Sequence, residues 1–335
     1  MAYDKVVDSA SLDSKLTQVA DAIRTKGNTS ADLQFPSGFI SAIQAIQTGT
    51  ELKIIVSVTS GATVTAAKGS KVVSGTSVDG TCTLTVPEAG TWSVSASLNG
   101  QTSETVSVSV KDSYALTLLF LKDNFADNDW SAIIAACHSG SVPSTWVVGN
   151  SKTMQINGAS YQIDIIGKNH DTYTSGGTAP LTFQMHDLYN QSYVMNVSST
   201  NKGGWKDSAM RATYLPTILA LMPTEVQNGI REVNKLTSAG RQSATINTTA
   251  DKLFLLSEIE IFGSVIYSFY GEGTQYDYYK AGNSKVKKNE RGNASQWWER
   301  SPTNSYSSFC VVLNDGVASN SDAFSGSDVA FGFCF

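Results

Sequence analysis

Several features are scarce or missing in this chain of 335 residues. No apolar run reaches the roughly 20 residues that cross a membrane as a helix, so no membrane insertion is expected. Charged residues make up 16% of the chain and the net charge is -5. This balance argues against nucleic acid as the partner, because phosphate binding needs a basic surface. The first ten residues lack the basic and apolar regions of a signal peptide, which indicates synthesis in a cytoplasm.

Motifs for catalysis and for cofactors are missing as well. The cysteines form no CxxC pair, and the histidines do not occur as HExxH. No GxSxG, P-loop or glycosidase signature occurs, and the sequence lacks the Glu-Pro-Asn and Trp-Asn-Asp motifs of calcium-dependent lectins. We therefore predict no enzyme, no cofactor and no metal site, although a calcium site elsewhere in the chain stays open. Whether Cys310 and Cys334 form a disulfide stays open.

Apolar periodicity divides the chain into three segments. The first, residues 1–50, has apolar residues at helical spacing in two short stretches, Leu12–Ile23 and Phe39–Ile46. Two helices this short bury too little surface to be stable alone, so we expect a partner. Residues 16–46 resemble N-terminal segments that are common in tail proteins of phages from gut bacteria. The resemblance implies a role in attachment or oligomerisation. A helical cap on the next domain is the alternative.

The second segment, residues 51–112, alternates apolar and polar residues in several short runs. Period two is typical of half-buried strands. Asp79-Gly80 and Asn99-Gly100 separate such runs, and these dipeptides favour hairpin turns. We predict a small immunoglobulin-like β-sandwich that serves as a spacer, with Cys82 as a core thiol.

The third segment, residues 113–335, holds most of the aromatic residues. We predict a helix after Asp129 that stops at Gly140, and a hairpin around Asn157-Gly158. Near the end, two apolar strands flank a polar run of Ser, Asn, Asp and Gly. Phe309 lies in the first strand and Phe333 in the second.

The motif Trp-Trp-Glu-Arg-Ser-Pro at 297–302, followed by Phe-Cys at 309–310, Asp-Gly at 315–316 and Val-Ala-Phe-Gly-Phe-Cys at 329–334, carries a resemblance. It resembles a C-type-lectin-like family related to formylglycine-generating enzyme, over about the last 200 residues. Members often have Leu where this chain has Glu299. Many members are variable proteins of diversity-generating retroelements on phage tails, in which randomised adenines diversify a ligand-binding face. The resemblance implies an α+β C-type-lectin-like domain.

The residue types near the end of the chain fit such diversification. Randomising adenines in Asn codons cannot produce Lys, Glu, Gln, Met or Trp, and none of these occurs from Ser301 to Phe335. Ordinary strand and loop composition also accounts for this absence. The predicted ligand-binding residues combine aromatic and small polar side chains, as antibody paratopes do. They are Asn304, Tyr306, Ser308, Phe309, Leu313, Ser319, Asn320, Asp322, Phe324, Ser325, Ser327 and Asp328.

Core packing is the alternative for Phe309, Leu313 and Phe324. Trp297, Trp298 and Arg300 are predicted to be scaffold, with Arg300 paired to Glu299. The sequence thus predicts a multidomain phage tail protein in the virion, which binds a host-cell receptor of protein or glycan. Its N-terminal segment would contact other tail proteins or form a homo-oligomer, and a homotrimer is our expectation. A copper oxidase of the formylglycine-generating type and a purely structural tail protein are the alternatives.

Overall fold

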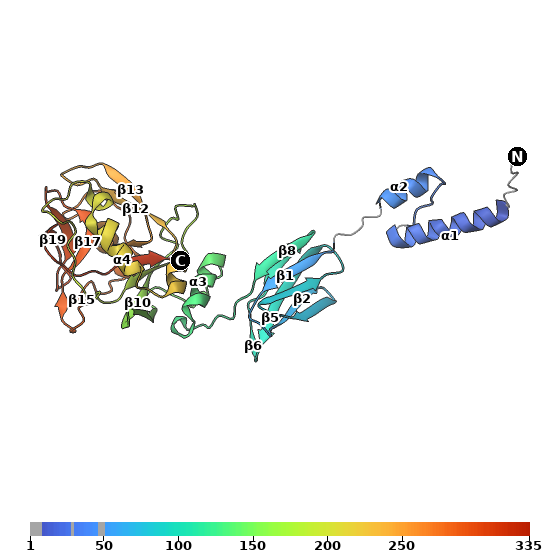
Figure 1. The fold of residues 1–335 in the computed structure, drawn as a ribbon, viewed down its shortest axis with the longest axis horizontal. Coiled ribbons are helices and arrows are strands. Elements are labelled where there is room, and N and C mark those ends of the chain that lie inside the picture. Colours follow the sequence, from blue (N-terminus) through green and yellow to red (C-terminus); the bar gives the residue numbers. More distant parts are fainter. Residues whose placement is uncertain (1–8, 28–29, 46–50) are drawn as a thin grey trace. The chain divides into compact units, whose positions relative to one another are not determined.

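The computed structural model describes residues 9–27, 30–45 and 51–335. It divides into two units, Met1–Leu118 and Leu119–Phe335, and is rich in β-structure with several separate sheets and a few helices (Figure 1). Within the described residues, no helix is both long and apolar enough to span a bilayer.

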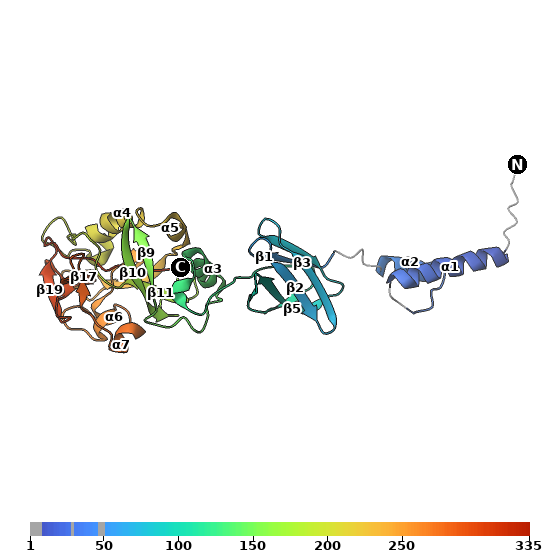
Figure 2. The same cartoon turned by 90° about the horizontal axis from the view of Figure 1, so that it is seen from below.

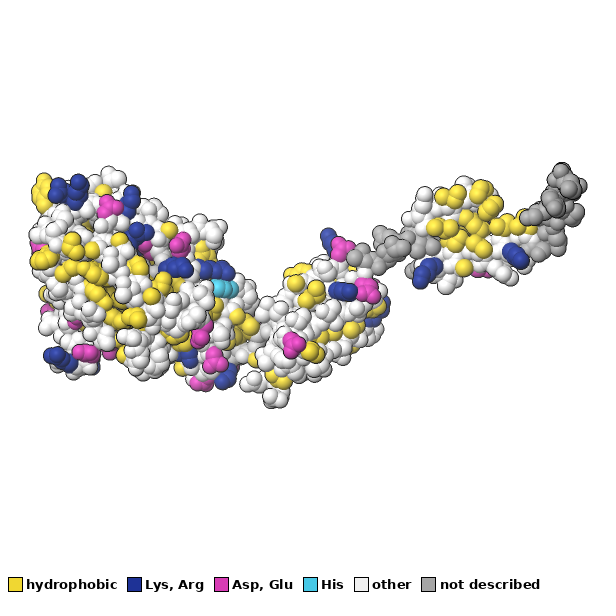
Figure 3. All heavy atoms as spheres, viewed as in Figure 1, with side chains coloured by type: hydrophobic (Ala, Val, Ile, Leu, Met, Phe, Trp, Pro, Cys, Tyr) yellow, Lys and Arg dark blue, Asp and Glu magenta, His cyan; other side chains and the backbone are white. Residues whose placement is uncertain are grey.

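Helices α1 (Ser9–Gly27) and α2 (Ser37–Ala45) pack against each other through a small apolar cluster. Ala20, Ile23 and Phe39 are buried in it. Figure 3 shows hydrophobic side chains gathered on the visible face of this helical pair. The large apolar side chains of the helices and their connection that stay exposed are Leu12, Val19, Phe35, Ile40 and Ile43. Leu12, Val19 and Ile43 lie on helices as their spacing predicts, and their exposure leaves them available to the partner that we expect; Ile46 lies outside the described residues.

The rest of the first unit consists of two sheets (Figures 1 and 2). One has the order β4-β1-β8, and the other has the order β3-β2-β5-β6 with β7 also paired to β5. The strands are β1 (Lys53–Ser57), β2 (Thr63–Lys68), β3 (Lys71–Thr76), β4 (Thr81–Thr85), β5 (Gly90–Leu98), β6 (Gln101–Thr102), β7 (Val106–Val110) and β8 (Ser113–Thr117).

Several predicted features of this unit can be checked residue by residue. Asp79-Gly80 and Asn99-Gly100 adopt positive φ at both residues, as a tight hairpin turn requires. Cys82 is buried as predicted, and Gly75 of the other sheet faces it: an added Cβ would lie 3.1 Å from the Cys82 sulfur. The predicted boundary after residue 112 lies too early, because β8 pairs in parallel with β1 and extends the unit to Leu118.

The second unit is built on a five-stranded sheet with the order β14-β20-β11-β10-β9. A three-stranded sheet β17-β18-β19 and the pairs β12-β13 and β15-β16 accompany it. The strands are β9 (Ser151–Ile156), β10 (Ala159–Lys168), β11 (Leu181–Met185), β12 (Val233–Ser238), β13 (Ile246–Asp251), β14 (Leu253–Phe254), β15 (Lys287–Lys288), β16 (Ala294–Ser295), β17 (Trp297–Pro302), β18 (Ser308–Val312), β19 (Ala318–Asp322) and β20 (Gly332–Cys334).

Short helices complete the second unit. They are α3 (Trp130–Ser139), α4 (Leu215–Leu219), α5 (Thr224–Gly229), α6 (Glu258–Phe262) and α7 (Asp277–Lys280). As predicted, α3 follows Asp129 and ends at Gly140, which adopts the left-handed conformation. The predicted turn at Asn157-Gly158 joins β9 and β10 with positive φ at both residues.

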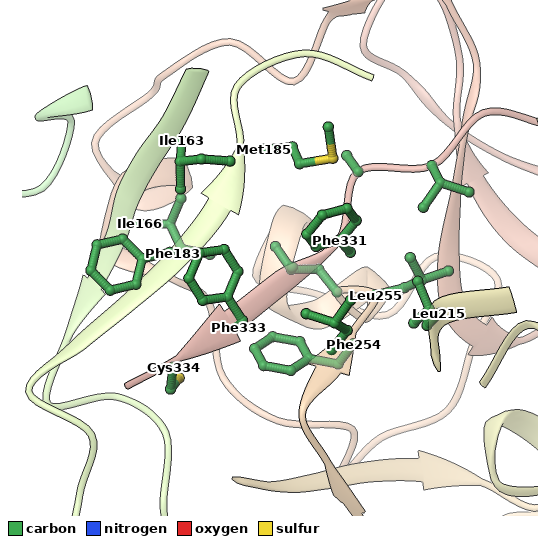
Figure 4. Packing of buried hydrophobic residues seen from close by; sticks show 14 of the residues in the cluster. Ile163, Ile166, Phe183, Met185, Leu215, Phe254, Leu255, Phe331, Phe333 and Cys334 are labelled. Atoms are coloured by element: carbon green, nitrogen blue, oxygen red, sulfur yellow. The ribbon is translucent and has the colours of Figure 1, made fainter. Parts of the chain in front are cut away.

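The core of the second unit lies around β20, which pairs with β11 on one side and β14 on the other. Figure 4 shows Phe331 and Phe333 packed among Phe183, Phe254 and Leu255. The sequence predicts that alternate residues of this strand face opposite sides. Cys334 is nevertheless as fully buried as Phe333, because both faces of this central strand are covered.

Candidate ligand-binding site

Strands β18 and β19 form an antiparallel hairpin that contains half of the predicted ligand-binding residues, and four of the others lie within four residues of its ends. The register pairs Cys310 with Asn320 and Ser308 with Asp322. The sequence predicts a polar loop at 319–322, but these residues form an edge strand. Strand β18 is central and β17 lies on its other side, so β18 is almost wholly buried while β19 stays partly exposed.

Two large aromatic side chains are exposed where this hairpin opens. Beyond the last ladder pair, the Ala323 N–H donates to the Ser307 carbonyl at 2.8 Å. Tyr306 precedes Ser307 and Phe324 follows Ala323, and their side chains are 61% and 60% exposed. Both segments leave the ladder at this point, and both rings are largely exposed and available to a partner.

A third segment, residues 196–201, lies against the end of this hairpin. The Asn196 N–H donates to the Ala323 carbonyl at 2.9 Å, and the Asn201 N–H donates to the Tyr306 carbonyl at 3.0 Å. The buried Asn201 side chain also donates to the carbonyls of residues 303, 305 and 308. We call the three adjoining segments 196–201, 304–308 and 319–325 the display region. Asn201 fixes the backbone of the segment 304–308, and Asn196 joins the first segment to Ala323.

Asp322 is the acidic group of the display region. The Ser199 hydroxyl and the Phe324 N–H both donate to its carboxylate. These hydrogen bonds lower the pKa of Asp322 below its usual value. The carboxylate is therefore charged at neutral pH, beside an exposed aromatic ring.

Most of the predicted residues reach the surface. Leu313 is half-buried and packs against the core. The exposed or half-exposed positions are Asn304, Tyr306, Ser308, Leu313, Ser319, Asn320, Asp322, Phe324 and Ser325.

The prediction of an exposed ligand-binding side chain is wrong for Phe309. Ser327 and Asp328 are buried as well. Phe309 is fully buried because it lies in the central strand β18. The buried Ser327 hydroxyl donates to the Gln296 carbonyl at 3.1 Å, and Asp328 accepts from the Ser192 hydroxyl. These two residues cannot project from the surface as the Tyr306 and Phe324 side chains do.

Ser327 and Asp328 instead line a polar pocket of about 320 Å³. The remaining lining residues come from loops around β15 and β16 and from residues 189–192. They are Tyr189, Asn190, Ser192, Asn289, Glu290, Arg291, Ser295, Gln296 and Gly326. We call this pocket the groove, and a second pocket of about 320 Å³ lies beside it, because both are lined by Asn190, Asn289 and Glu290. Sequence reasoning missed this groove, and the loop-like composition before Trp297 is the only signal of it.

A buried ionic network holds the scaffold below the display region. Arg300 of β17 is fully buried and forms two hydrogen bonds to the Glu260 carboxylate, one of 2.7 Å. Lys235 of β12 lies 2.9 Å from Glu260 and 2.7 Å from Asp171. The scaffold role predicted for Arg300 fits this geometry, but the predicted pairing with Glu299 is wrong. The partner is Glu260, from α6.

The two C-terminal cysteines are free thiols that face different carboxylates. The Cys310 sulfur lies 3.8 Å from a Glu258 oxygen, and the Cys334 sulfur lies 3.9 Å from an Asp171 oxygen. Burial and the nearby carboxylates raise the pKa of both thiols. They do not form the disulfide that the sequence left open.

Comparison with known proteins gives one match. A family described as a domain of unknown function, DUF6273, matches residues 182–330, which lie within the second unit. No curated protein and no solved structure matches the chain.

Proposed function

We propose that this chain is a phage tail protein that binds a receptor on the host cell through its display region. One observation carries the proposal: Tyr306 and Phe324, which lie just beyond the last hydrogen-bonded positions of the β18–β19 hairpin, are both largely exposed. Large aromatic side chains give much contact area at a small entropic cost, and neighbouring Ser and Asn side chains give adaptable hydrogen bonds. A rigid support lowers the cost of binding further.

The groove beside Ser327 supports a second contact area. Its lining is dominated by amide, hydroxyl and charged groups, with Tyr189 at one side. Polar groups of this kind bind the hydroxyl groups of glycans as well as protein backbones. The receptor in this proposal is therefore a glycan or a protein of the host surface.

We further propose a C-type-lectin-like fold for the second unit and an immunoglobulin-like spacer for residues 51–118. The support is the motif at 297–302, whose six residues are all buried, and the alternating strands of the spacer. The DUF6273 match covers the same motif but assigns no function.

The N-terminal helices fit an attachment or oligomerisation role in the virion. Five apolar side chains of α1, α2 and their connection are exposed, which is costly in water and is relieved by a partner. Further copies of this chain, as in a homotrimer, or another tail protein would cover them.

The two alternative functions find less support. A copper oxidase of the formylglycine-generating type needs a cysteine pair, whereas Cys310 and Cys334 face different carboxylates. A purely structural tail protein gives no reason to expose Tyr306 and Phe324 together.

Binding of the fluorescently labelled full chain to a panel of intact gut-bacterial strains tests the proposal. We expect saturable binding to particular strains, and a loss of at least tenfold in affinity for the Tyr306→Ala/Phe324→Ala variant. Tyr270→Ala is the matched control, because Tyr270 is also exposed but lies outside the display region. Equal binding by all three proteins would contradict the role of the display region.

Diversification is tested separately, by sequencing the gene from related phage isolates. We expect substitutions at positions such as 304, 320 and 324 to coincide with adenines of a nearby template repeat. Substitutions that ignore the template would remove the retroelement from the proposal and leave receptor binding intact.

A further inference from the structure

Glu299 of β17 is a buried carboxyl group without a partner. Its side chain is fully buried, and neither oxygen has a hydrogen-bond donor. In the part of the chain that the structure describes, the only other buried side-chain nitrogen or oxygen in this condition is Nδ1 of His170. Burial of an unpaired carboxylate is strongly unfavourable, so such a group calls for an explanation.

Two further potential ligands surround Glu299. A carboxylate oxygen of Glu258, a carboxylate oxygen of Glu299 and the Cys310 sulfur all lie within 4.8 Å of one another, and all three residues are fully buried. They come from α6, β17 and β18, which are three separate elements of the second unit. The chain thus brings two carboxyl groups and one thiol together in a dry interior.

The hydrogen bonds of Glu258 leave one oxygen available. Its Oε2 accepts from the N–H groups of residues 266–268 and from the Ser268 hydroxyl. Its Oε1 accepts only from the Tyr267 N–H at 2.9 Å and, weakly, from the Cys310 thiol. Once the thiol loses its proton, Oε1 has a free lone pair directed at the same space.

Among the described residues, no cationic side chain forms an ion pair with Glu258 or Glu299, although the charge of Arg300 lowers the pKa of Glu299 to a lesser extent than the other effects raise it. The neighbouring Arg300 is committed to Glu260. Burial raises the pKa of Glu299 well above its usual value, and the nearby Glu258 and Glu272 raise it further. A bound metal ion would reverse this effect, because it stabilises the ionised forms of both carboxylate and thiol.

We propose that Glu258, Glu299 and Cys310 bind a structural divalent transition-metal ion, with zinc as the first expectation. On binding, the Glu299 carboxyl and the Cys310 thiol each release a proton, and one metal–sulfur and two metal–oxygen bonds form. The second oxygen of Glu299 or a water molecule would complete a tetrahedral site. A thiolate among the ligands favours zinc over calcium or magnesium.

The separation of the ligands permits this coordination. Zinc needs oxygens at about 2.0–2.2 Å and sulfur at about 2.3 Å, so the three atoms must move closer together. Glu299 is held by no hydrogen bond and can make that movement. The ion would also brace residues 266–268, whose Tyr267 carbonyl accepts from the Asn304 N–H of the display region at 3.0 Å.

Metal content of the full chain tests the site. After refolding with zinc and dialysis, elemental analysis should give about one zinc per chain, and refolding with Co(II) should give a thiolate-to-metal charge-transfer band. Cys310→Ser should lose the band, whereas Cys137→Ser should keep it, because Cys137 is also buried but lies outside the cluster.

Glu299→Leu keeps the proposal falsifiable if Cys310→Ser does not fold, because Leu removes the unpaired carboxyl group and suits the interior. After refolding with zinc, the Glu299→Leu variant should hold less than a tenth of the zinc that wild type holds. Its melting temperature should be the same whether or not a chelator was present while it refolded. The proposal is overturned if refolded wild-type protein takes up neither zinc nor cobalt, which would leave Glu299 as a neutral acid. Equal zinc in Glu299→Leu and wild type would overturn it as well.

Discussion

Strands β17 and β19 are the two outer strands of one three-stranded sheet, yet their side chains meet opposite environments. All six residues of β17 are buried, including Glu299 and Arg300. In β19 only Ala318 is buried, and Asn320 is exposed. Strand β17 is covered by the elements that supply Glu260 and Lys235, whereas the side chains of β19 are left partly exposed to solvent.

Substitutions should therefore be poorly tolerated in β17 and well tolerated in β19. A residue of β17 must satisfy buried partners on both faces, so most substitutions there leave a cavity or an unpaired group. A residue of β19 contacts water on one side, and its side chain can change with little effect on packing. A protein that varies its ligand-binding residues needs this separation, and the predictions below test it.

The largest effect is expected at Arg300. Arg300→Ala removes one of the two cations that pair with the buried Glu260, leaves Lys235 as the other, and removes the donor to the buried Leu255 and Glu272 carbonyls. The loss should lower the free energy of unfolding by about 3–5 kcal/mol. Urea denaturation of the full chain, followed by tryptophan fluorescence, measures it. Arg291→Ala should stay within about 0.5 kcal/mol of wild type, because Arg291 is exposed. Similar losses in both variants would show that β17 is not specially constrained.

The two phenylalanines Phe309 and Phe324 give the next comparison. Phe309→Ala empties a fully buried site and should cost about 3–4 kcal/mol, whereas Phe324→Ala should cost less than about 0.5 kcal/mol. Thermal unfolding of the full chain measures both. A large loss for Phe324→Ala would mean that its ring packs in the core, and the display region would lose its central residue.

A pH effect is expected from Glu272, whose buried carboxylate accepts from the Ser238 N–H and the Ser301 hydroxyl. Burial raises its pKa from 4.5 to about 7. Between these values the folded chain binds more protons than the unfolded chain, so the free energy of unfolding falls as the pH rises and levels off above about 7. Relative to Glu272→Gln, wild type should lose about 3 kcal/mol between pH 4.5 and 7. Parallel pH profiles from denaturant titrations of the two proteins would refute this.

The smallest effect is expected on the edge strand. Asn320→Tyr should change the free energy of unfolding by less than about 0.5 kcal/mol, because the side chain projects into solvent. The same measurement on Ala318→Tyr serves as the contrast, since Ala318 is buried and overpacking costs about 1–3 kcal/mol. If Asn320→Tyr is as damaging as Ala318→Tyr, β19 is not the tolerant strand that diversification requires.

Local patterns account for the predictions that the structure bears out. The Asx-Gly dipeptides place three hairpin turns, because few other residues adopt two successive positive φ angles. Cys82 follows the phase of Leu84 and Val86, and Gly140 ends α3. Each of these signals depends on residues that are neighbours in the sequence.

The candidate site was predictable only in part, for the same reason. The composition of residues 304–325 indicated an exposed region with aromatic residues, and Tyr306 and Phe324 are exposed there. Phe309 could not be distinguished from them, because strand periodicity does not show whether both faces of a strand are covered. The groove beside Ser327 brings together residues about 130 positions apart, so no local pattern reveals it.

By itself, the sequence determined the turns and the phases of most strands. Only the tertiary structure decided that Phe309 is buried while Phe324 is exposed, that Arg300 pairs with Glu260, and that Glu299 has no partner. Backbone turns and alternation depend on interactions within a few residues. Burial and the pairing of charges depend on which distant elements cover a strand, and that is settled only when the whole domain packs.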